Sequence, residues 1–179
     1  MNELDPANRY PRTAYEFHGA PITTEWIRTD KEDEFSPVTQ VYGICFNAAG
    51  EILVCRSSST GGWQIPGGTP EGNETLTATL QRELHEEVDI RVSNVQMLGV
   101  QRVHYPNNPD QAIGDDFYQA RMICDIEEIL PSTPDPAINQ TWERQFVTQD
   151  QVTELVPWGE AGRAMFNDAI KLWQDSRRP

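Results

Sequence analysis

The chain has 179 residues, a length that usually folds into one domain around one core. Hydrophobic residues make up 37% of it, and no apolar run approaches the roughly 18 residues needed to span a bilayer, so we expect a folded protein with no membrane partner. Acidic residues outnumber basic ones by 28 to 14, and the net charge of −14 argues against a nucleic-acid partner bound through its backbone.

Residues 1–37 are polar and hold four prolines, so we predict an N-terminal extension with at most a short strand at 23–28. The alternative is a structured segment in which Trp26, Ile27 and Phe35 pair with the core or with a second subunit in a homodimer. No basic start followed by an apolar stretch marks a secretory signal at the N-terminus, which favours a cytoplasmic location.

Short β-rich runs begin at residue 38. The runs at 41–46 and 52–55 flank a turn that contains a glycine, which predicts a hairpin. Small residues at 57–62 predict a loop, and 63–65 is a brief strand that ends at Pro66-Gly67-Gly68. The cysteines stand singly and lack the CxxC spacing of a zinc site, so we expect buried thiols at Cys45, Cys55 and Cys124.

Residues 74–88 give the clearest helix. One apolar stripe repeats at every fourth position and predicts that this helix packs against a sheet through Leu76, Leu80, Leu84 and Val88. Strands are predicted at 90–103, 117–126 and 145–147, and a last helix at 160–174. This order of β-rich and helical segments predicts an α+β fold with a mixed sheet between helices, an α/β/α sandwich.

Three glutamates share one face of the predicted helix. Glu83, Glu86 and Glu87 stand at i, i+3 and i+4, so their carboxylates form one ridge beside the leucine stripe. Such close carboxylates repel one another unless a cation neutralises them, and Mg²⁺ prefers a few carboxylates together with phosphate and water oxygens. The alternative is an ordinary acidic face in solvent. The glycine pair at 67–68 favours the cation site, because it lets backbone approach a ligand closely.

The residues around this ridge resemble the Nudix box, in which Gly, Glu, Arg-Glu and Glu-Glu stand at fixed spacings. The match begins at Gly68, continues through Glu74 and Arg82, and ends at Ile90. In the family, the residues at the positions of Glu74 and Arg82 orient the loop and the ridge. The segment from Trp63 to Gly68 also resembles the usual lead-in of the box.

One position departs from the box, because Asp89 stands where the family has Gly. The family glycine ends the helix in a left-handed conformation, which Asp tolerates better than most residues do. The strand order around the box extends the resemblance to about 38–174 and implies a Nudix hydrolase domain at 38–179.

The resemblance implies hydrolysis of a pyrophosphate bond with Mg²⁺, for which Mn²⁺ can substitute. The implied catalytic residues are Glu83, Glu86 and Glu87, and the implied metal ligands are the same glutamates with Gly67. The general base stays open between Glu83 and a loop carboxylate, for which the candidates are Asp115, Asp116 and Glu143.

The box leaves most of the substrate open, so the expected partner is a small molecule, a nucleoside diphosphate linked to another moiety. Pro106 lies sixteen residues after Ile90, a spacing that resembles the marker of ADP-ribose pyrophosphatases and favours an ADP-ribose-like substrate. The residues expected to bind substrate are Arg56, Gly67, Gly68 and Tyr105. Other aromatic and basic candidates are Trp63, Phe117, Arg102, His104 and Arg121, whereas packing is expected for Trp142, Trp158 and Trp173.

Two other functions stay open. One is a nucleoside triphosphate pyrophosphatase of the housecleaning type, and the other is a non-catalytic nucleotide-binding module of Nudix-like fold. Isopentenyl diphosphate isomerases share the fold, but their chemistry needs a cysteine in the loop where this chain has the residues from Trp63 to Gly68. Isomerisation is therefore not expected.

Overall fold

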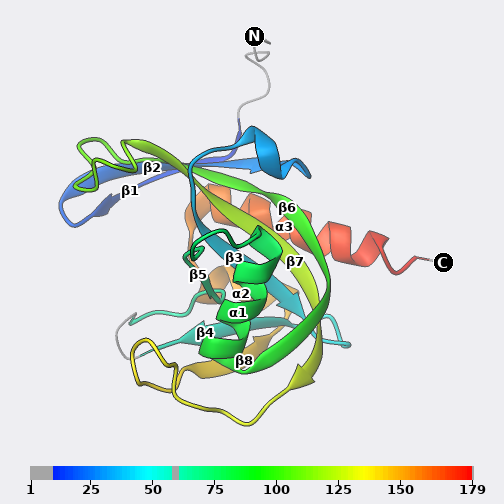
Figure 1. Cartoon of the computed structure of the whole chain (residues 1–179). Coiled ribbons are helices and arrows are strands. Elements are labelled where there is room, and N and C mark those ends of the chain that lie inside the picture. The colour runs from blue at the N-terminus through cyan, green and yellow to red at the C-terminus, as the bar shows by residue number, and fades with distance from the viewer. Residues whose placement is uncertain (1–9, 58–60, 179) are drawn as a thin grey trace.

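The computed structural model describes residues 10–57 and 61–178. Its strands are β1 (Arg12–Phe17), β2 (Ala20–Arg28), β3 (Val38–Phe46), β4 (Ile52–Arg56), β5 (Gly67–Gly68), β6 (Ile90–His104), β7 (Asp116–Ile129) and β8 (Glu143–Val147). Its helices are α1 (Leu76–Val88), α2 (Gln149–Leu155) and α3 (Gly159–Asp175), with a short 3-10 turn η1 (Glu32–Glu34). The strands form one sheet in the order β1-β2-β6-β7-β3-β4-β8, with β5 paired to β3 (Figure 1).

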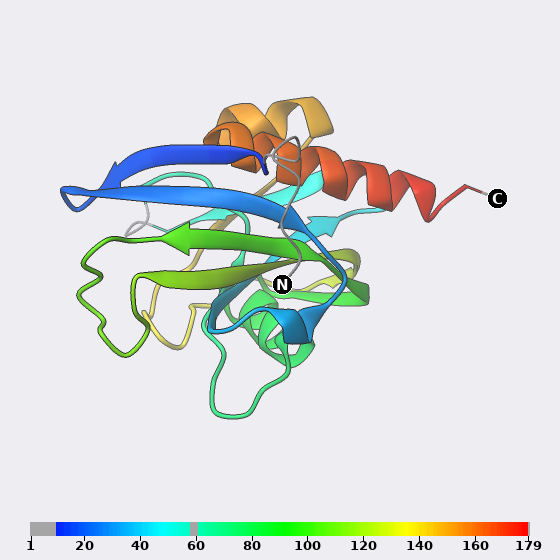
Figure 2. The same cartoon turned by 90° about the horizontal axis from the view of Figure 1, so that it is seen from above.

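The sheet is mixed, because β3 runs parallel to β7 whereas the other paired strands run antiparallel. Helix α1 covers one face, and α2 and α3 cover the other (Figure 2). These layers confirm the expected α+β sandwich. The predicted hairpin of β3 and β4 is also confirmed, although its ladder is short because the same edge of β3 pairs with β5 at Val41 and Tyr42.

Strand β3 divides its side chains between two cores, as the two-residue period of a strand requires. Ile44 and Phe46 pack with the residues of α2 and α3, whereas Val41 and Cys45 pack with the leucine stripe of α1. Full burial of each such aliphatic or aromatic side chain stabilises the fold by about 1.5–3 kcal/mol. The three cysteines are free and buried, as expected, and the Sγ atoms of Cys45 and Cys124 lie 3.3 Å apart.

Helix α1 begins and ends at specific side-chain contacts. The hydroxyl of Thr75 accepts a hydrogen bond from the Ala78 N–H at 3.2 Å and caps the first turn. Asp89 follows the last turn with φ 48° and ψ 52°, the left-handed conformation expected at this position. Its carboxylate accepts hydrogen bonds from the backbone N–H and the hydroxyl of Thr133, at 3.1 and 2.6 Å. The departure from the box therefore fixes a distant loop as well as the helix end.

The N-terminal part corrects the expectation of at most a short strand at 23–28. Strands β1 and β2 form a hairpin whose edge extends the sheet beside β6, and the hairpin projects as an arm (Figure 2). The arm is fastened to α3, because Trp26 Nε1 donates to Asp168 at 2.8 Å and the Ala161 N–H donates to Thr13 Oγ1 at 3.0 Å. Residues 1–9 of the expected extension lie outside the described ranges.

One further expectation was wrong, and one helix was missed. The strand expected at 63–65 is only a single bridge between Gln64 and Cys55, and the paired residues are Gly67 and Gly68 instead. Helix α2 was not predicted, although Thr148 and Gln151 form a capping box at its start. Part of the loop expected at 57–62 lies outside the described ranges. Among the helices of the described ranges, none is long and apolar enough to cross a membrane.

Candidate functional site

The glycine turn and α1 form the centre of the site. The N–H of Gly67 donates to Oε2 of Glu87 at 2.9 Å, and the carboxylate of Glu83 lies directly against Gly68. A Cβ on Gly68 would stand 2.4 Å from the Glu83 carboxylate, so this close approach requires glycine. Gly67 has φ 146° and lies over the backbone of Val41, where a Cβ would stand 2.1 Å from the carbonyl oxygen. The turn therefore fixes two of the three ridge glutamates.

Arg82 connects this ridge to the loop that precedes α1. Its Nε and Nη2 donate to the two carboxylate oxygens of Glu74 at 2.9 and 3.1 Å, and Nη2 also donates to the Thr69 carbonyl at 2.9 Å. Its Nη1 donates to Glu83 and to Glu86, each at 3.0 Å. The hydrogen bonds of Arg82 lower the pKa of Glu74 to about 2, so this brace is charged at neutral pH. These contacts are those expected of residues that orient the loop.

Burial acts on two of the ridge glutamates, Glu83 and Glu87. Burial raises the pKa of Glu87 to about 8, and the negative charges of Glu83, Asp135 and Glu86 contribute to this rise against the Gly67 hydrogen bond. Burial likewise raises the pKa of Glu83, although Arg82 opposes the shift. Glu87 is only 8% exposed and forms no salt bridge with a basic side chain of the described residues. A buried carboxylate with no basic partner is unfavourable in its charged form, and a bound cation would stabilise it.

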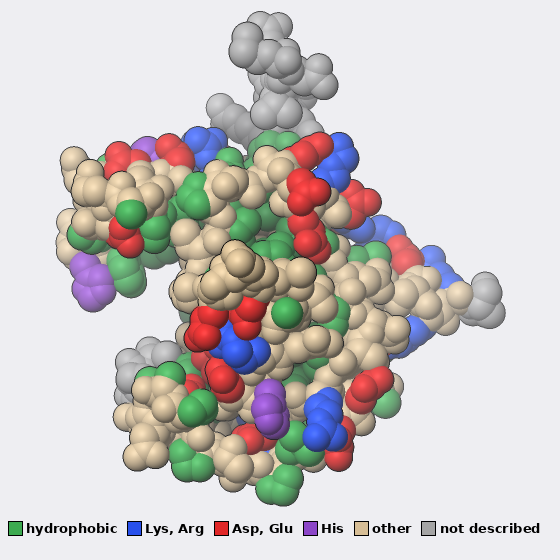
Figure 3. Space-filling view, in the orientation of Figure 1, with side chains coloured by type: hydrophobic (Ala, Val, Ile, Leu, Met, Phe, Trp, Pro, Cys, Tyr) green, Lys and Arg blue, Asp and Glu red, His purple; other side chains and the backbone are tan. Residues whose placement is uncertain are grey.

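The carboxylates of the ridge are the type of ligand that a divalent cation prefers. Glu83, Glu86 and Glu87 offer hard oxygen ligands on one helix face, and acidic side chains gather around a basic one over α1 (Figure 3). Within residues 10–57 and 61–178, however, no three acidic, histidine or cysteine side chains already converge on a common point. The reason is that Arg82 Nη1 lies between Glu83 and Glu86, where it neutralises them. The metal ligands, Gly67 included, stay predictions.

Asp135 was missed by the sequence analysis. Its negative charge contributes to the raised pKa of both Glu83 and Glu87, although it lies in the loop that follows β7. The carboxylate is 6% exposed and accepts hydrogen bonds from Trp142 Nε1 at 2.9 Å and the Ala137 N–H at 2.8 Å. The only signal in the sequence was the acidic, proline-rich composition of this loop.

The other expected base candidates lie elsewhere. Asp116 pairs with Arg102 and His104 at the end of β6, at 3.0 and 3.2 Å. Glu143 has a side chain that is 64% exposed and pairs with Arg56 at 2.7 Å. Asp115 accepts a hydrogen bond from the N–H of Asn108 at 3.1 Å within the loop between β6 and β7.

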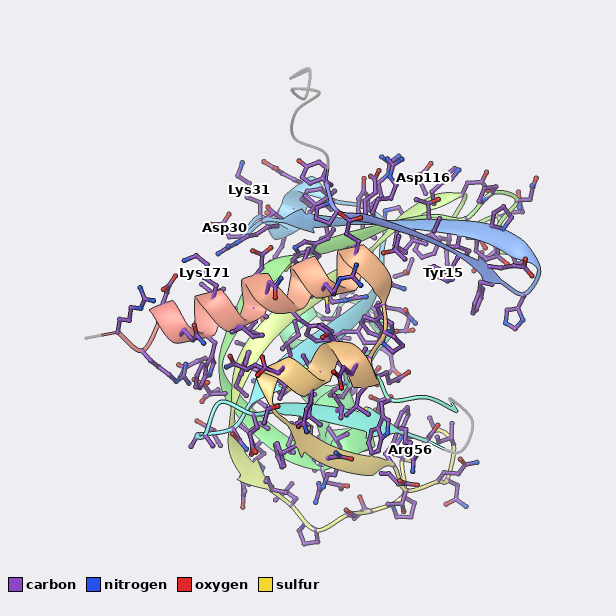
Figure 4. The ribbon with its side chains drawn as sticks, turned by 180° about the vertical axis from the view of Figure 1, so that it is seen from behind. Tyr15, Asp30, Lys31, Arg56, Asp116 and Lys171 are labelled. Atoms are coloured by element: carbon purple, nitrogen blue, oxygen red, sulfur yellow. The ribbon has the colours of Figure 1, made fainter. Side chains whose placement is uncertain are left out.

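Two of the expected substrate contacts lie apart from each other. Arg56 is held by Glu143 and lies over the ring of Trp63, with 4.6 Å between Cζ and the ring centroid. Tyr105 lies at the end of β6, where its ring meets the edge of Phe17 on the arm at a centroid distance of 6.2 Å. In the view of Figure 4, Tyr15, also on the arm, lies above Arg56 on the same side of the molecule. Gly67 and Gly68 are the expected substrate contacts that adjoin the ridge.

Comparison with known proteins gives a family match and several partial relatives. The NUDIX domain matches residues 37–168. An RNA pyrophosphohydrolase of Halorhodospira halophila is 39% identical over 70 residues, which cover 39% of this chain and 38% of that protein. A MutT-like protein of Streptomyces ambofaciens is 37% identical over 60 residues, which cover 34% of this chain and 39% of that protein. These matches thus span less than half of each curated relative.

A solved structure resembles the whole chain more closely in shape than in sequence. A point mutant of the pyrophosphohydrolase BsRppH of Bacillus subtilis superposes with a TM-score of 0.62 over 92% of this chain and 98% of that one. The sequence identity is 15%, so the similarity establishes a shared fold.

Proposed function

This chain belongs to the NUDIX family, and from that premise we propose that it hydrolyses a phosphoanhydride bond in a nucleoside diphosphate linked to another moiety. The observation that carries the proposal is the carboxylate of Glu87, which is buried, held by Gly67 and unpaired with any basic side chain of the described residues. Mg²⁺, or Mn²⁺ in its place, would be held by Glu83, Glu86, Glu87 and Gly67.

The residues of the chain act mainly by positioning. Gly67 orients Glu87, and Gly68 leaves room for Glu83, so both carboxylates lie at the same turn, where they would hold the cation. Arg82 and Glu74 hold this turn against the helix. A cation held by these residues would offset the charge of the diphosphate and would lower the pKa of a water. For the general base we retain Glu83, because its carboxylate lies at the turn.

Two substrate classes are compatible with this proposal. The spacing of Pro106 favours an ADP-ribose-like substrate. Nucleoside triphosphates are the second class. The relatives named RNA pyrophosphohydrolase and MutT-like protein support a substrate that contains a pyrophosphate bond. Against an RNA substrate stands the net charge of −14, which repels a long polyanion. Three other expectations stay predictions: the division of the chain at residue 38, a homodimer contact through residues 1–37, and a cytoplasmic location.

A substrate panel tests this proposal. The full chain is incubated with ADP-ribose, nucleoside triphosphates, dinucleoside polyphosphates, NADH and nucleotide sugars, with Mg²⁺ or with a chelator. The proposal expects hydrolysis of at least one compound that depends on the metal and is lost in Glu87→Gln. Tight binding of a nucleotide without any turnover would instead identify a non-catalytic nucleotide-binding module.

A further inference from the structure

Arg121 is a buried cation without an anionic partner. The side chain is 2% exposed, and burial lowers its pKa to about 10, so it remains charged at neutral pH. Its hydrogen bonds go to neutral acceptors: Nη2 donates to Gln101 and Gln119 at 2.6 and 2.8 Å, and Nη1 donates to the Ala120 carbonyl at 3.2 Å. No salt bridge joins it to an acid of the described residues, although the chain holds 28 acidic residues.

The guanidinium of Arg121 also has unused donors. Its Nε is fully buried and has no hydrogen-bond partner in the part of the chain that the structure describes. An unpaired buried N–H destabilises the fold, and does so more strongly when the group is charged. The rings of Tyr42 and Trp158 hold the guanidinium in place, at 4.5 and 5.5 Å from Cζ to the ring centroids. Arg121 is thus fixed in position for an acceptor that the protein does not supply.

A cavity of about 430 Å³ opens at this arginine. Its walls come from the arm, from β3, β6 and β7, and from the start of α3, and they include the rings of Tyr15, Phe17, Tyr42 and Trp158. Tyr15 and Phe17 are each 47% exposed, and Figure 4 shows Tyr15 on the arm. The volume lies in the range of small-molecule sites, and the aromatic walls suit a flat ring.

Tyr42 connects this cavity to the acidic ridge. It lines the cavity, and in the sheet it pairs with Gly67, whose N–H binds Glu87. A ligand whose diphosphate lies at the glycine turn can therefore extend past Tyr42 into the cavity. This step rests on the proposed function, because it assumes that the diphosphate binds at the ridge.

We propose that the cavity binds the base of the nucleotide substrate, and that Arg121 selects a base whose edge presents hydrogen-bond acceptors. Guanine presents the acceptor O6 at the position where adenine carries an amino donor, so a remaining N–H of Arg121 favours guanine. A second phosphate would fit less well, because Arg121 is the only basic side chain among the described residues that line the cavity and the walls are mainly aromatic. The substrate class is then a guanine nucleotide.

The test measures binding without turnover. The full chain in chelator is titrated with GMP, AMP and ribose 5-phosphate, and tryptophan fluorescence is followed because Trp158 lines the cavity. GMP should bind about tenfold more tightly than AMP, because guanine O6 accepts a hydrogen bond from Arg121 where adenine presents an amino donor. Equal affinity for GMP and AMP, or equal affinity for ribose 5-phosphate and GMP, would overturn the proposal.

Gln101→Glu is the most informative variant. Glutamate has nearly the same shape as glutamine, so the fold should be kept. Its carboxylate would replace the amide oxygen that lies 2.6 Å from Nη2 and would give Arg121 an anionic partner within the protein. The preference for GMP should fall to less than about twofold, and the unfolding transition should not move to lower denaturant. The matched control is Gln96→Glu on the same strand, where the side chain is exposed and the preference should persist.

The outcomes separate this proposal from the proposed function. Metal-dependent hydrolysis with a base preference that Gln101→Glu leaves unchanged would refute the role of Arg121 and leave the hydrolase assignment intact. Selective binding of GMP that Gln101→Glu abolishes, in a chain that hydrolyses nothing in the panel, would support the cavity and refute the hydrolase.

Discussion

The Gly67 N–H lies 2.9 Å from Oε2 of Glu87, and this one hydrogen bond joins the glycine turn to the last turn of α1. The bond sets the direction of a carboxylate that is otherwise desolvated and near other negative charges. Because Gly67 also pairs with Tyr42 in β3, the ridge and the Arg121 cavity share one backbone segment.

Glu87→Gln should abolish metal-dependent hydrolysis while preserving the fold. The amide can still accept the Gly67 hydrogen bond, but it carries no charge for a cation. We expect kcat to fall about 100-fold or more, since even residues that only support a metal ligand affect activity by about 10–100-fold. Steady-state kinetics on the best substrate of the panel measures the change. His85→Gln, an exposed change on the same helix, is the control and should keep full activity.

The metal-free protein should lose stability as the pH rises from about 5 to 8. The folded state keeps a proton on Glu87 up to a pKa of about 8, whereas the unfolded chain loses it near 4.5. The folded state therefore binds more protons across this range, and the free energy of unfolding falls as pH increases. Urea unfolding in chelator at about pH 5, 6.5 and 8 measures the slope.

Glu74 should not disturb that measurement, because its pKa of about 2 and its unfolded value of 4.5 lie below the range. Glu87→Gln should make the slope shallower and leave a remainder from Glu83, whose pKa is also raised, and saturating Mg²⁺ should flatten the slope in the unchanged chain. An unchanged slope in Glu87→Gln would assign the pH dependence to another group.

Gly68→Ala should impair hydrolysis more than folding. The added Cβ would stand 2.4 Å from the Glu83 carboxylate, which must then move away from the turn. A displacement of about 1 Å in a reacting group can reduce the rate on the order of 100-fold. Gly62→Ala is the matched control, because nothing lies within 4 Å of its Cβ position. Equal rates for the two variants would show that the position of Glu83 does not matter.

Asp89→Gly, which restores the residue of the box, should destabilise the protein. Glycine relieves the left-handed backbone, but it removes both hydrogen bonds to Thr133. Each bond to a carboxylate contributes about 1.5–3 kcal/mol and the relieved backbone offsets about 1–2 kcal/mol, so the free energy of unfolding should fall by about 1–5 kcal/mol. Asp89→Asn keeps one acceptor, so its free energy of unfolding should lie between those of the unchanged chain and Asp89→Gly. Increased stability of Asp89→Gly, measured by urea unfolding, would contradict this account.

The sequence predicted the elements whose signals are local. Helix α1 carries its stripe and its glutamates within one segment, so its bounds and its ridge could be placed from spacing alone. Strands β6 and β7 were also found, because long β-rich runs leave few alternatives. Strand β1 was missed since most of its side chains are exposed and only its contacts with β2 and α3 explain it.

The residues that the sequence could not place depend on contacts between distant segments. Arg121 meets Tyr42 because β7 runs parallel to β3, a pairing across 79 positions that no local pattern encodes. Asp135 acts on Glu83 from a loop that the box does not include. Trp158 was expected only to pack, and it packs against Phe166 while it also lines the cavity.

The base preference also separates the two substrate predictions. An ADP-ribose-like substrate, which Pro106 favours, would place an adenine amino group beside Arg121. The cavity chemistry favours a keto base instead. The panel therefore needs adenine and guanine members of each substrate class.

The proposed function requires that Glu83, Glu86 and Glu87 bind a divalent cation while Arg82 stays bonded to Glu74. Mn²⁺ binding to the full chain, followed by the loss of the free-ion electron paramagnetic resonance signal, tests it directly. The account predicts saturable binding that weakens about 10-fold or more in Glu86→Gln and in Glu87→Gln, with His85→Gln unchanged. Binding of equal strength in all four proteins, or no binding in the unchanged chain, would contradict it.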